Sequence, residues 1–229
     1  MTQYIYPIYC CYDSGITTDE ENAIVSALKE FKALFPEREI RNYGRSSWGN
    51  GSYNCADWYV QHTDKINKLE IGHQQLDAES MLSLLMNEPW QQKRPHIDVV
   101  FVSDDITTKR LNFCFGAACG RVTVQSVYRY RHASSLNEEE KALAIKAVVL
   151  HELGHTLNMA ANPYRRKTEP KLGIHCAQHG CIMQQGMNVP EFVQHAKDAR
   201  ALDRWYCPLC LADAKRHIAA QQQFVVANT

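Results

Sequence analysis

The fold of this chain depends on one stretch, Val148-Val149-Leu150-His151-Glu152-Leu153-Gly154-His155-Thr156-Leu157. On a helix, residues four positions apart stand nearly above one another, so His151 and His155 can present two imidazoles to one metal ion. Glu152 lies about 100° round the helix from His151 and can reach a water on that metal without being a ligand. Two neutral nitrogen ligands and a carboxylate base are typical of zinc-assisted amide hydrolysis.

The residues before this stretch predict a long amphipathic helix. Asn137, with Glu140 three residues later, has the pattern of an N-terminal capping box. An apolar stripe follows, made by Leu143, Ala147, Leu150 and Leu157. The alternative, a surface helix with two solvated histidines, would need more polar flanks. We therefore expect an active-site helix over residues 137–158.

A catalytic zinc needs a third protein ligand, and four residues further along the chain are candidates: Glu169, His175, His179 and Glu191. A second pattern begins directly after His175, at Cys176. Two cysteine pairs with short internal spacing predict a tetrahedral structural zinc site formed by Cys176, Cys181, Cys207 and Cys210. Two local disulfides, or free thiols, are the alternatives.

Met183, two residues after Cys181, completes a resemblance to the archaemetzincins, a family of metzincin metalloproteases. Their pattern is His-Glu-x-x-His-x-x-Gly-x-x-His-Cys, then x4-Cys-x-Met, and later Cys-x2-Cys. It maps onto His151, Glu152, His155, His175, Cys176, Cys181, Met183, Cys207 and Cys210.

The resemblance implies two zinc ions, one catalytic and one structural. His175 would be the third catalytic ligand, beside His151 and His155, and Met183 would form the apolar floor known as the Met-turn. Some metzincins add a tyrosine ligand two residues after the methionine. That position is Gln185 here, so no such ligand is assigned.

The chain departs from the family pattern between its second and third histidines. The family places the third histidine six residues after the second, whereas His175 follows His155 by twenty, which indicates an insertion of fourteen residues over 159–172. Asn158 occupies the family's glycine position. Asparagine tolerates the left-handed conformation, so the helix could turn there. Alternatively, it continues to Asn162 and is stopped by proline.

The expected fold is α/β: a metzincin-like single domain over residues 1–229 with a mixed, twisted sheet. Residues 1–158 would supply the N-terminal sheet, its helices and the active-site helix. Residues 159–229 would supply the C-terminal part with the third histidine, the Met-turn and the zinc-stabilised four-cysteine site. Strands are predicted at Tyr4–Cys10, Arg38–Tyr43, Ile97–Val102 and Arg121–Tyr130, and helices at Asp19–Phe35, Asp77–Glu88 and Leu211–Gln223.

Two of these segments carry further expectations. Apolar and polar residues alternate over Arg121–Tyr130, which predicts a half-buried strand. By the family resemblance this strand borders the cleft, so Gly120–Val127 could align an extended substrate, with Gly120, Val122 and Val124 as substrate-binding residues. A plain sheet strand is the alternative. The charged stretch Glu191–Arg204 is expected to bury little apolar surface, so the structural zinc would fix it.

Composition limits the partners. The chain has 229 residues, 45% hydrophobic residues and a formal net charge of zero, so nothing attracts it generally to nucleic acid or anionic membranes. We expect a monomer with a peptide or protein substrate. The first residues have neither a basic region nor a long apolar core, and four of the nine cysteines have metal-like spacing. Both features favour the reducing cytoplasm.

The sequence therefore predicts a zinc-dependent metallopeptidase in which Glu152 is the general base for a zinc-bound water. The zinc would stabilise the oxyanion, with Tyr164 or Tyr206 as alternatives. Two other functions stay open. The insertion could close the cleft and leave a two-zinc binding or regulatory module, or the substrate could be an amide that is not a peptide.

Overall fold

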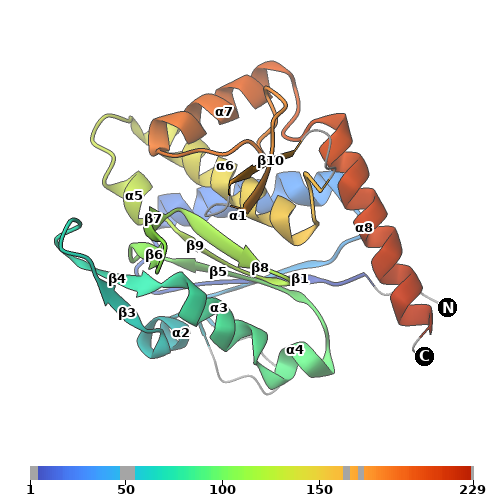
Figure 1. Ribbon diagram of the computed structural model, residues 1–229, viewed down its shortest axis with the longest axis horizontal. Helices are drawn as coiled ribbons and strands as arrows, with labels where there is room; N and C mark the ends of the chain where they lie inside the picture. Colours follow the sequence, from blue (N-terminus) through green and yellow to red (C-terminus); the bar gives the residue numbers. More distant parts are fainter. Residues whose placement is uncertain (1–4, 47–54, 162–165, 170–172, 228–229) are drawn as a thin grey trace.

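The computed structural model describes residues 5–46, 55–161, 166–169 and 173–227 (Figure 1). A five-stranded sheet lies at its centre in the order β2 (Ile40–Gly44), β1 (Ile8–Tyr12), β5 (Ile97–Val102), β9 (Val122–Ser126), β8 (Gly116–Cys119). Four of these strands are parallel, and β8 is antiparallel to β9 at one edge. The sheet is therefore mixed, as predicted, and β5 is its middle strand.

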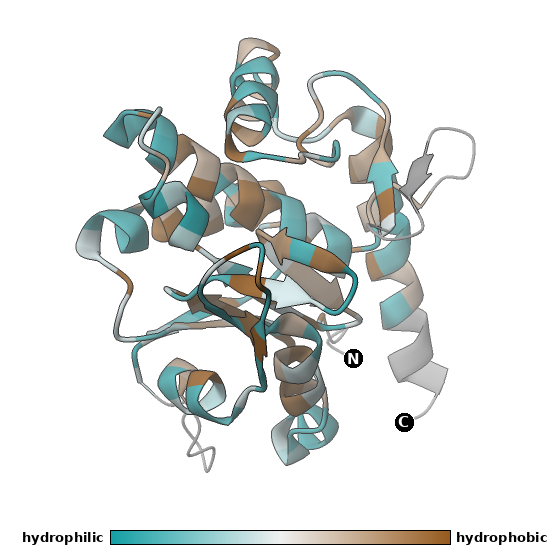
Figure 2. Ribbon diagram, turned by 60° about the vertical axis from the view of Figure 1, so that its left-hand side comes forward, coloured by the Kyte–Doolittle hydropathy of each residue, from teal (hydrophilic) through white to brown (hydrophobic). Residues whose placement is uncertain are grey.

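Helices cover both faces of this sheet (Figure 1). One face packs against α1 (Thr18–Leu34) and α6 (Glu138–Thr156), and the other against α2 (Ala56–His62) and α3 (Ala78–Met86), with α4 (Pro89–Lys93) nearby. Alternate residues of β1 divide between the two cores: Ile8 and Cys10 face α1 and α6, and Tyr9 and Cys11 face α2 and α3. Because both faces are covered, the central strand β5 is buried along its whole length and is apolar except at Asp98, and Figure 2 shows hydrophobic residues gathered in this region.

The long helix α6 begins and ends where the sequence places signals. Asn137 and Glu140 form both hydrogen bonds of a capping box. At the other end Asn158 adopts a left-handed φ of 53°, and the N–H of Met159 donates to the carbonyl of Gly154 at 3.0 Å. The predicted turn at Asn158 is therefore confirmed, and the alternative, in which the helix continues to Asn162, is wrong. Most of the last three turns are buried because the helix lies between the sheet and α7 (Val189–Ala201).

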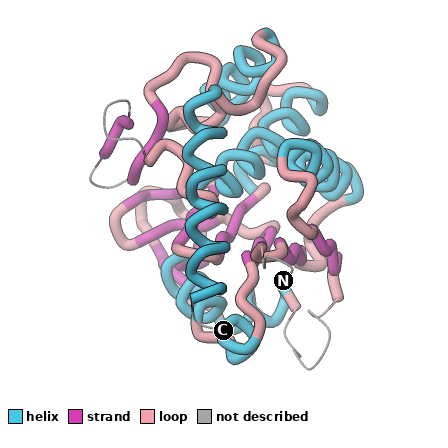
Figure 3. Tube along the Cα trace, turned by 90° about the vertical axis from the view of Figure 1, so that its right-hand side faces the viewer, coloured by secondary structure: helices cyan, strands magenta, loops and turns pink. Residues whose placement is uncertain are grey.

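A second, four-stranded sheet has the order β3 (Lys65–Asn67), β4 (Gln74–Asp77), β6 (Ile106–Thr108), β7 (Leu111–Cys114). Only Phe115 separates β7 from β8, so one run of chain forms an edge of both sheets. After α6, β10 (Arg166–Glu169) and β11 (Gly173–Cys176) form an antiparallel hairpin. Figure 3 shows this hairpin projecting from the molecule, with α8 (Pro208–Ala227) running along one side.

Several predicted boundaries need correction. The strand predicted over Arg121–Tyr130 ends at Ser126, because Tyr128–Arg131 forms the short helix α5. The strand β9 is fully buried and not half-buried as predicted, since α3 covers one of its faces and α6 the other. The first strand begins at Ile8, and Tyr4 lies outside the described residues.

The charged segment near the C-terminus buries more apolar surface than its composition suggests. Helix α7 places Phe192, Val193, Ala196 and Ala199 on one buried face, against α6. The few apolar residues fall at helical spacing, so they form one stripe despite the charges between them. The expectation that this stretch buries little was wrong. Among the helices that the structure describes, none has both the length and the apolar character for a membrane span.

Candidate metal centres and catalytic cleft

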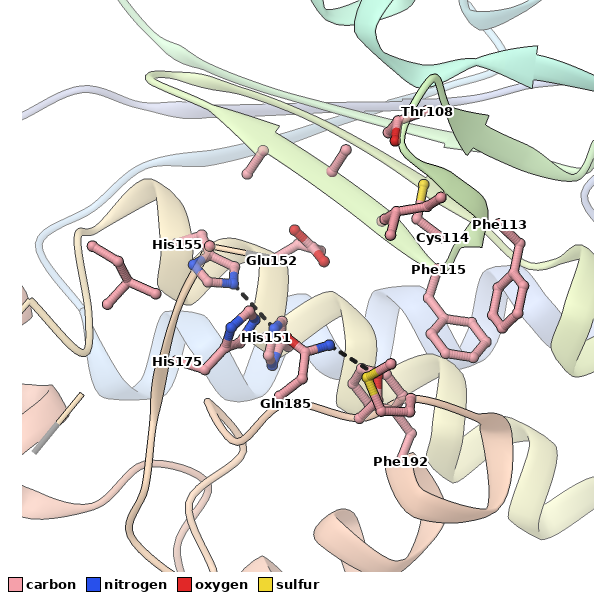
Figure 4. Close-up of a pocket in the computed structure, with 18 of the residues that line it drawn as sticks. Thr108, Phe113, Cys114, Phe115, His151, Glu152, His155, His175, Gln185 and Phe192 are labelled. Atoms are coloured by element: carbon pink, nitrogen blue, oxygen red, sulfur yellow. Dashed lines mark hydrogen bonds between the residues drawn. The ribbon is translucent and has the colours of Figure 1, made fainter. Parts of the chain in front are cut away.

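Three histidines from two elements meet at one point (Figure 4). His151 and His155 come from α6 and His175 from β11, and one ring nitrogen of each lies within 4.8 Å of those of the other two. The Nε2 atoms of His151 and His155 are 3.1 Å apart. Nitrogen ligands of a tetrahedral zinc, at about 2.05 Å from the metal, lie about 3.3 Å from each other. The two imidazoles of α6 thus have the spacing of ligands that share one ion.

Burial, and for His151 a hydrogen bond, favour the neutral, metal-binding form of the two α6 imidazoles. The carbonyl of Ile182 accepts a hydrogen bond from Nδ1 of His151 at 2.8 Å, which leaves the lone pair on Nε2. Burial, and then the neighbouring imidazoles of His155 and His175, lower the pKa of His151 well below its usual value. Burial also lowers the pKa of His155 to about 3. Neutral imidazole is the ligand state of histidine.

Glu152 follows the first histidine on α6 and faces the same cleft (Figure 4). Only 6% of the residue is exposed, and this burial raises the pKa of its carboxyl to about 8. Burial favours the neutral form, whereas a divalent cation in the adjacent histidine cluster would favour the ionised form. A carboxyl with so large a shift, beside a set of metal-binding groups, is a candidate acid–base residue.

The cleft has a volume of about 700 Å³, within the usual range for ligand sites. The run formed by β7 and β8 makes one wall, from Leu111 to Ala118. On the opposite side β11 contributes Ile174 and His175, and the segment after Met183 contributes Gln185 and Met187. The three histidines and Glu152 also line the cleft, so a molecule bound there can reach these polar groups.

Four cysteines form a second cluster close to the first. Their Sγ atoms lie within 4.8 Å of one another, with 3.9 Å between Cys176 and Cys207 and 3.7 Å between Cys181 and Cys210. A tetrahedral zinc with bonds of about 2.3 Å to sulfur separates its ligands by about 3.8 Å, whereas a disulfide bond is about 2.05 Å. None of the nine cysteines, all of them in the described part of the chain, forms a disulfide. The alternative of two local disulfides is wrong.

The fold was compared with known structures. An archaemetzincin from Methanopyrus kandleri is 18% identical to this chain, with a TM-score of 0.62 over 93% of this chain and 96% of the other. A zinc-dependent peptidase from Methanocorpusculum labreanum is 16% identical, with a TM-score of 0.60 over 90% and 99%. An archaemetzincin from Archaeoglobus fulgidus, complexed with malonate, is 20% identical, with a TM-score of 0.50 over 90% and 99%.

This chain has the archaemetzincin fold. The three structures match almost the whole of this chain and almost the whole of their own, so the fold is shared from end to end. A scan of protein-family models and a search of the curated proteins find no match.

Within the archaemetzincin fold, the edge strand beside the cleft differs from the predicted one. Gly120 lines the cleft, but Val122 and Val124 do not. They belong to β9, between β5 and β8, and pack in the core on the α3 face, away from α6. Their assignment as substrate-binding residues was wrong, because alternation along a strand cannot tell an edge position from an interior one. The strand at the edge is β8.

Sequence reasoning missed Gly116, the first residue of β8. A Cβ at this position would lie 2.6 Å from Cγ of Glu152 and 2.7 Å from its Oε1. Such contacts are too short for any side chain, so only glycine lets the strand pass this close to the carboxyl. The sequence around Gly116 resembles a loop and carries no signal for this long-range contact.

Met183 lies under α6 in the archaemetzincin fold and is fully buried. A Cβ on Gly154 would lie 2.2 Å from its sulfur, so the methionine packs against the bare backbone between the two helix histidines. Gln185, in the position of the tyrosine ligand of some metzincins, lines the cleft. The hydroxyl of Tyr206 donates to a backbone carbonyl of α6, and Tyr164 lies outside the described residues.

Two of the other candidate ligands, His179 and Glu191, do not join the histidine cluster. His179 is exposed and lies 3.8 Å from a carboxylate oxygen of Asp198. Glu191 accepts hydrogen bonds at the start of α7, from the N–H of Met187 and the side chain of Asn188. The side chain of Glu169 lies outside the described part of the chain.

Proposed function

We propose that this protein is a zinc-dependent peptidase of the archaemetzincin type. The observation that carries the proposal is the cluster of three imidazoles, two of them buried and that of His155 partly exposed, which opens together with Glu152 into one cleft. The donor set and the 3.1 Å separation of two ring nitrogens suit zinc. Two of the matched structures are archaemetzincins and the third is a zinc-dependent peptidase, which supports the same class of reaction.

The roles of the residues follow from their positions. His151, His155 and His175 would hold the catalytic ion. Zinc at this site would acidify water and polarise the scissile carbonyl as a Lewis acid. Glu152 would take a proton from the attacking water and deliver it to the leaving amine. Met183 would support the helix turn that carries the two α6 histidines.

The substrate would bind along the wall formed by β8. Its residues lining the cleft are small, namely Gly116, Ala117 and Ala118, and β8 ends the five-stranded sheet on this side. An extended peptide could therefore pair its backbone with the strand, next to Glu152. This proposal replaces the predicted pairing with β9.

The four cysteines would hold a structural zinc that stabilises residues 159–229 against the N-terminal part, within one domain. Their sulfur spacing supports this role. Thiols that stay reduced for metal binding are typical of the cytoplasm, where we place the protein.

Replacing Glu152 with glutamine tests the proposal most directly. The Glu152→Gln variant keeps the size of the side chain but cannot take a proton. We expect it to retain two zinc ions per chain and to lose peptide hydrolysis by at least about 10²–10⁴-fold. The assay is cleavage of a mixed peptide library, followed by mass spectrometry, with metal content measured in parallel.

Glu139→Gln is the matched control, because Glu139 is an exposed residue in the first turn of the same helix. It should cleave the library at the rate of the unchanged protein. If Glu152→Gln cleaved the library as fast as the unchanged protein, Glu152 would not be the general base. Two bound zinc ions with no cleavage of any peptide or simple amide by the unchanged protein would favour the alternative, a two-zinc binding or regulatory module.

A further inference from the structure

The two clusters of ligands are connected at three places, once directly along the chain and twice through a hydrogen bond. His175 and Cys176 are consecutive in β11. Cys181 precedes Ile182, whose carbonyl accepts the hydrogen bond from Nδ1 of His151 at 2.8 Å. Cys176 is thus adjacent to the candidate ligand His175. Cys181 is adjacent to Ile182, whose carbonyl orients the ring of His151.

Tyr206 makes the third connection. It precedes Cys207, only 1% of it is exposed, and its hydroxyl donates to the carbonyl of Leu150 at 2.6 Å. Leu150 precedes His151 on α6. The segment with Cys207 and Cys210 is therefore hydrogen-bonded to the turn of α6 that carries His151.

Backbone hydrogen bonds join these connections to one another. The N–H of Ile182 donates to the carbonyl of Trp205, and the N–H of Cys176 donates to the carbonyl of Met183, both at 2.8 Å. Cys176, Ile182 and Met183 are all buried. Displacement of the sulfur ligands would therefore either move the carbonyl of Ile182 that accepts from His151 or break one of these buried hydrogen bonds.

We propose that metal at the four cysteines raises the affinity of the three histidines for their own ion, with Tyr206 as a positioning residue that transmits this effect. An ion bound to all four sulfurs fixes the segments around Cys181 and Cys207 relative to each other. Ile182 then keeps the ring of His151 in the binding tautomer, and Tyr206 keeps the adjoining helix turn in place. The inference rests on the proposed function only in treating both clusters as metal sites, and it does not require hydrolysis.

Coupling of this kind is reciprocal, so it can be measured as a difference in affinity. Loss of a group that orients a metal ligand lowers metal affinity by about 10–100-fold. We therefore expect Tyr206→Phe, which changes no ligand, to weaken metal binding at the histidines by about tenfold. Cys210→Ser, which removes a sulfur ligand, should weaken it further.

The experiment uses the full chain and cobalt(II) as the probe, with zinc affinities from competition against a chromophoric chelator. Thiolate-to-cobalt charge-transfer bands in the near ultraviolet report the four cysteines, and the visible absorption that is gained after these bands have saturated reports the histidines. Tyr206→Phe should keep the charge-transfer bands of the unchanged protein. Its visible bands should shift and saturate at about tenfold higher free metal.

Tyr59→Phe is the matched control. Tyr59 is also fully buried, and its hydroxyl donates to Glu88 at 2.8 Å, on the α2 and α3 side of the sheet. This variant loses the same group but should bind metal at the histidines with unchanged affinity. It separates the proposed coupling from general destabilisation.

Equal histidine-site affinity in the unchanged protein and in Tyr206→Phe would overturn the coupling, even if Cys210→Ser does not fold. The same affinity in a folded Cys210→Ser variant would overturn it as well. Absence of peptide cleavage would contradict the proposed function and leave the affinity measurement intact. A chain whose histidines take up no ion would overturn both.

Discussion

The histidine cluster and the cysteine cluster differ in the number and kind of their donor atoms and in their access to solvent. The three imidazoles lie at the floor of an open cleft of about 700 Å³, with a titratable carboxyl beside them. The four sulfurs are buried and complete a tetrahedron among themselves. Three ligands leave a coordination position for water or substrate, and four leave none. The number of ligands and the access to solvent therefore suit the histidines to the proposed catalytic role and the cysteines to the proposed structural one.

The open cluster and the closed cluster are also connected through buried residues. A cleft that admits substrate cannot be filled by apolar side chains, so the packing around it is incomplete on one side. Tyr206 and Ile182 connect the open cluster to the closed one. Under the proposed coupling, the closed site would stabilise the ligands on the solvent-open side.

Stepwise removal of metal should give the largest effect. We expect a chelator to take the ion of the open histidine site first, with complete loss of peptide hydrolysis but little change in helical circular dichroism. The second ion should leave later, and the C-terminal part should then unfold. Metal content, turnover and circular dichroism are measured on the same samples. Loss of both ions in a single step would contradict the contrast between the sites.

Single ligand substitutions should separate the sites by stability. We expect Cys210→Ser to lose one zinc and to lower the free energy of unfolding by more than about 3 kcal/mol, because structural zinc binding contributes directly to folding. His155→Ala should also lose one zinc, with less than half of that effect. Urea unfolding at pH 7 with equal total zinc gives both values. Equal destabilisation would mean that the histidine site is structural too.

The contact between Gly116 and Glu152 provides a test confined to the open site. Gly116→Ala places a methyl group where the carboxyl lies, so Glu152 or the strand must move. A displacement of about 1 Å can cost about 10²-fold in rate, and we expect a loss of that order in kcat with two zinc ions retained. Gly72→Ala is the control. Its Cβ meets nothing within 4 Å but its backbone is left-handed, so it should cost stability without affecting turnover.

A change remote from both clusters should have the smallest effect. Glu20 is buried at the start of α1 and accepts hydrogen bonds from Arg131 and from the N–H of Thr17. Burial alone would raise the pKa of Glu20, but the bonds from Arg131 and Thr17 outweigh it and lower the pKa below its usual value. Its stabilising effect is therefore complete above the unfolded-state pKa of about 4.3 and is lost as pH falls through the lowered pKa.

We expect Glu20→Gln to lower the free energy of unfolding by about 1–2 kcal/mol at pH 7, with a smaller difference near pH 3. Metal content at pH 7 should stay at two ions. Denaturant titrations at the two pH values measure this change. A difference that does not depend on pH would mean that the charge of Glu20 contributes nothing.

Local signals in the sequence were reliable where local physics decides the structure. The capping box at Asn137 and the asparagine at 158 set the ends of α6, because caps and left-handed turns depend on a few neighbouring residues. The strand predicted at Ile97–Val102 has the predicted bounds, although Asp98 interrupts its apolar residues. Predictions failed for β9 and α7, where burial on a second face, or against another helix, comes from distant parts of the chain.

The sequence by itself determined which residues could bind metal, because ligand chemistry and spacing along a helix or a tight turn are local properties. Only the tertiary structure decided that His175 reaches the other two histidines after a twenty-residue separation, that β8 forms the cleft edge, and that Gly116 lies against Glu152. These facts depend on strand order and on contacts between residues far apart in the chain. These contacts form, and stabilise the protein, only once the sheet and α6 have packed together.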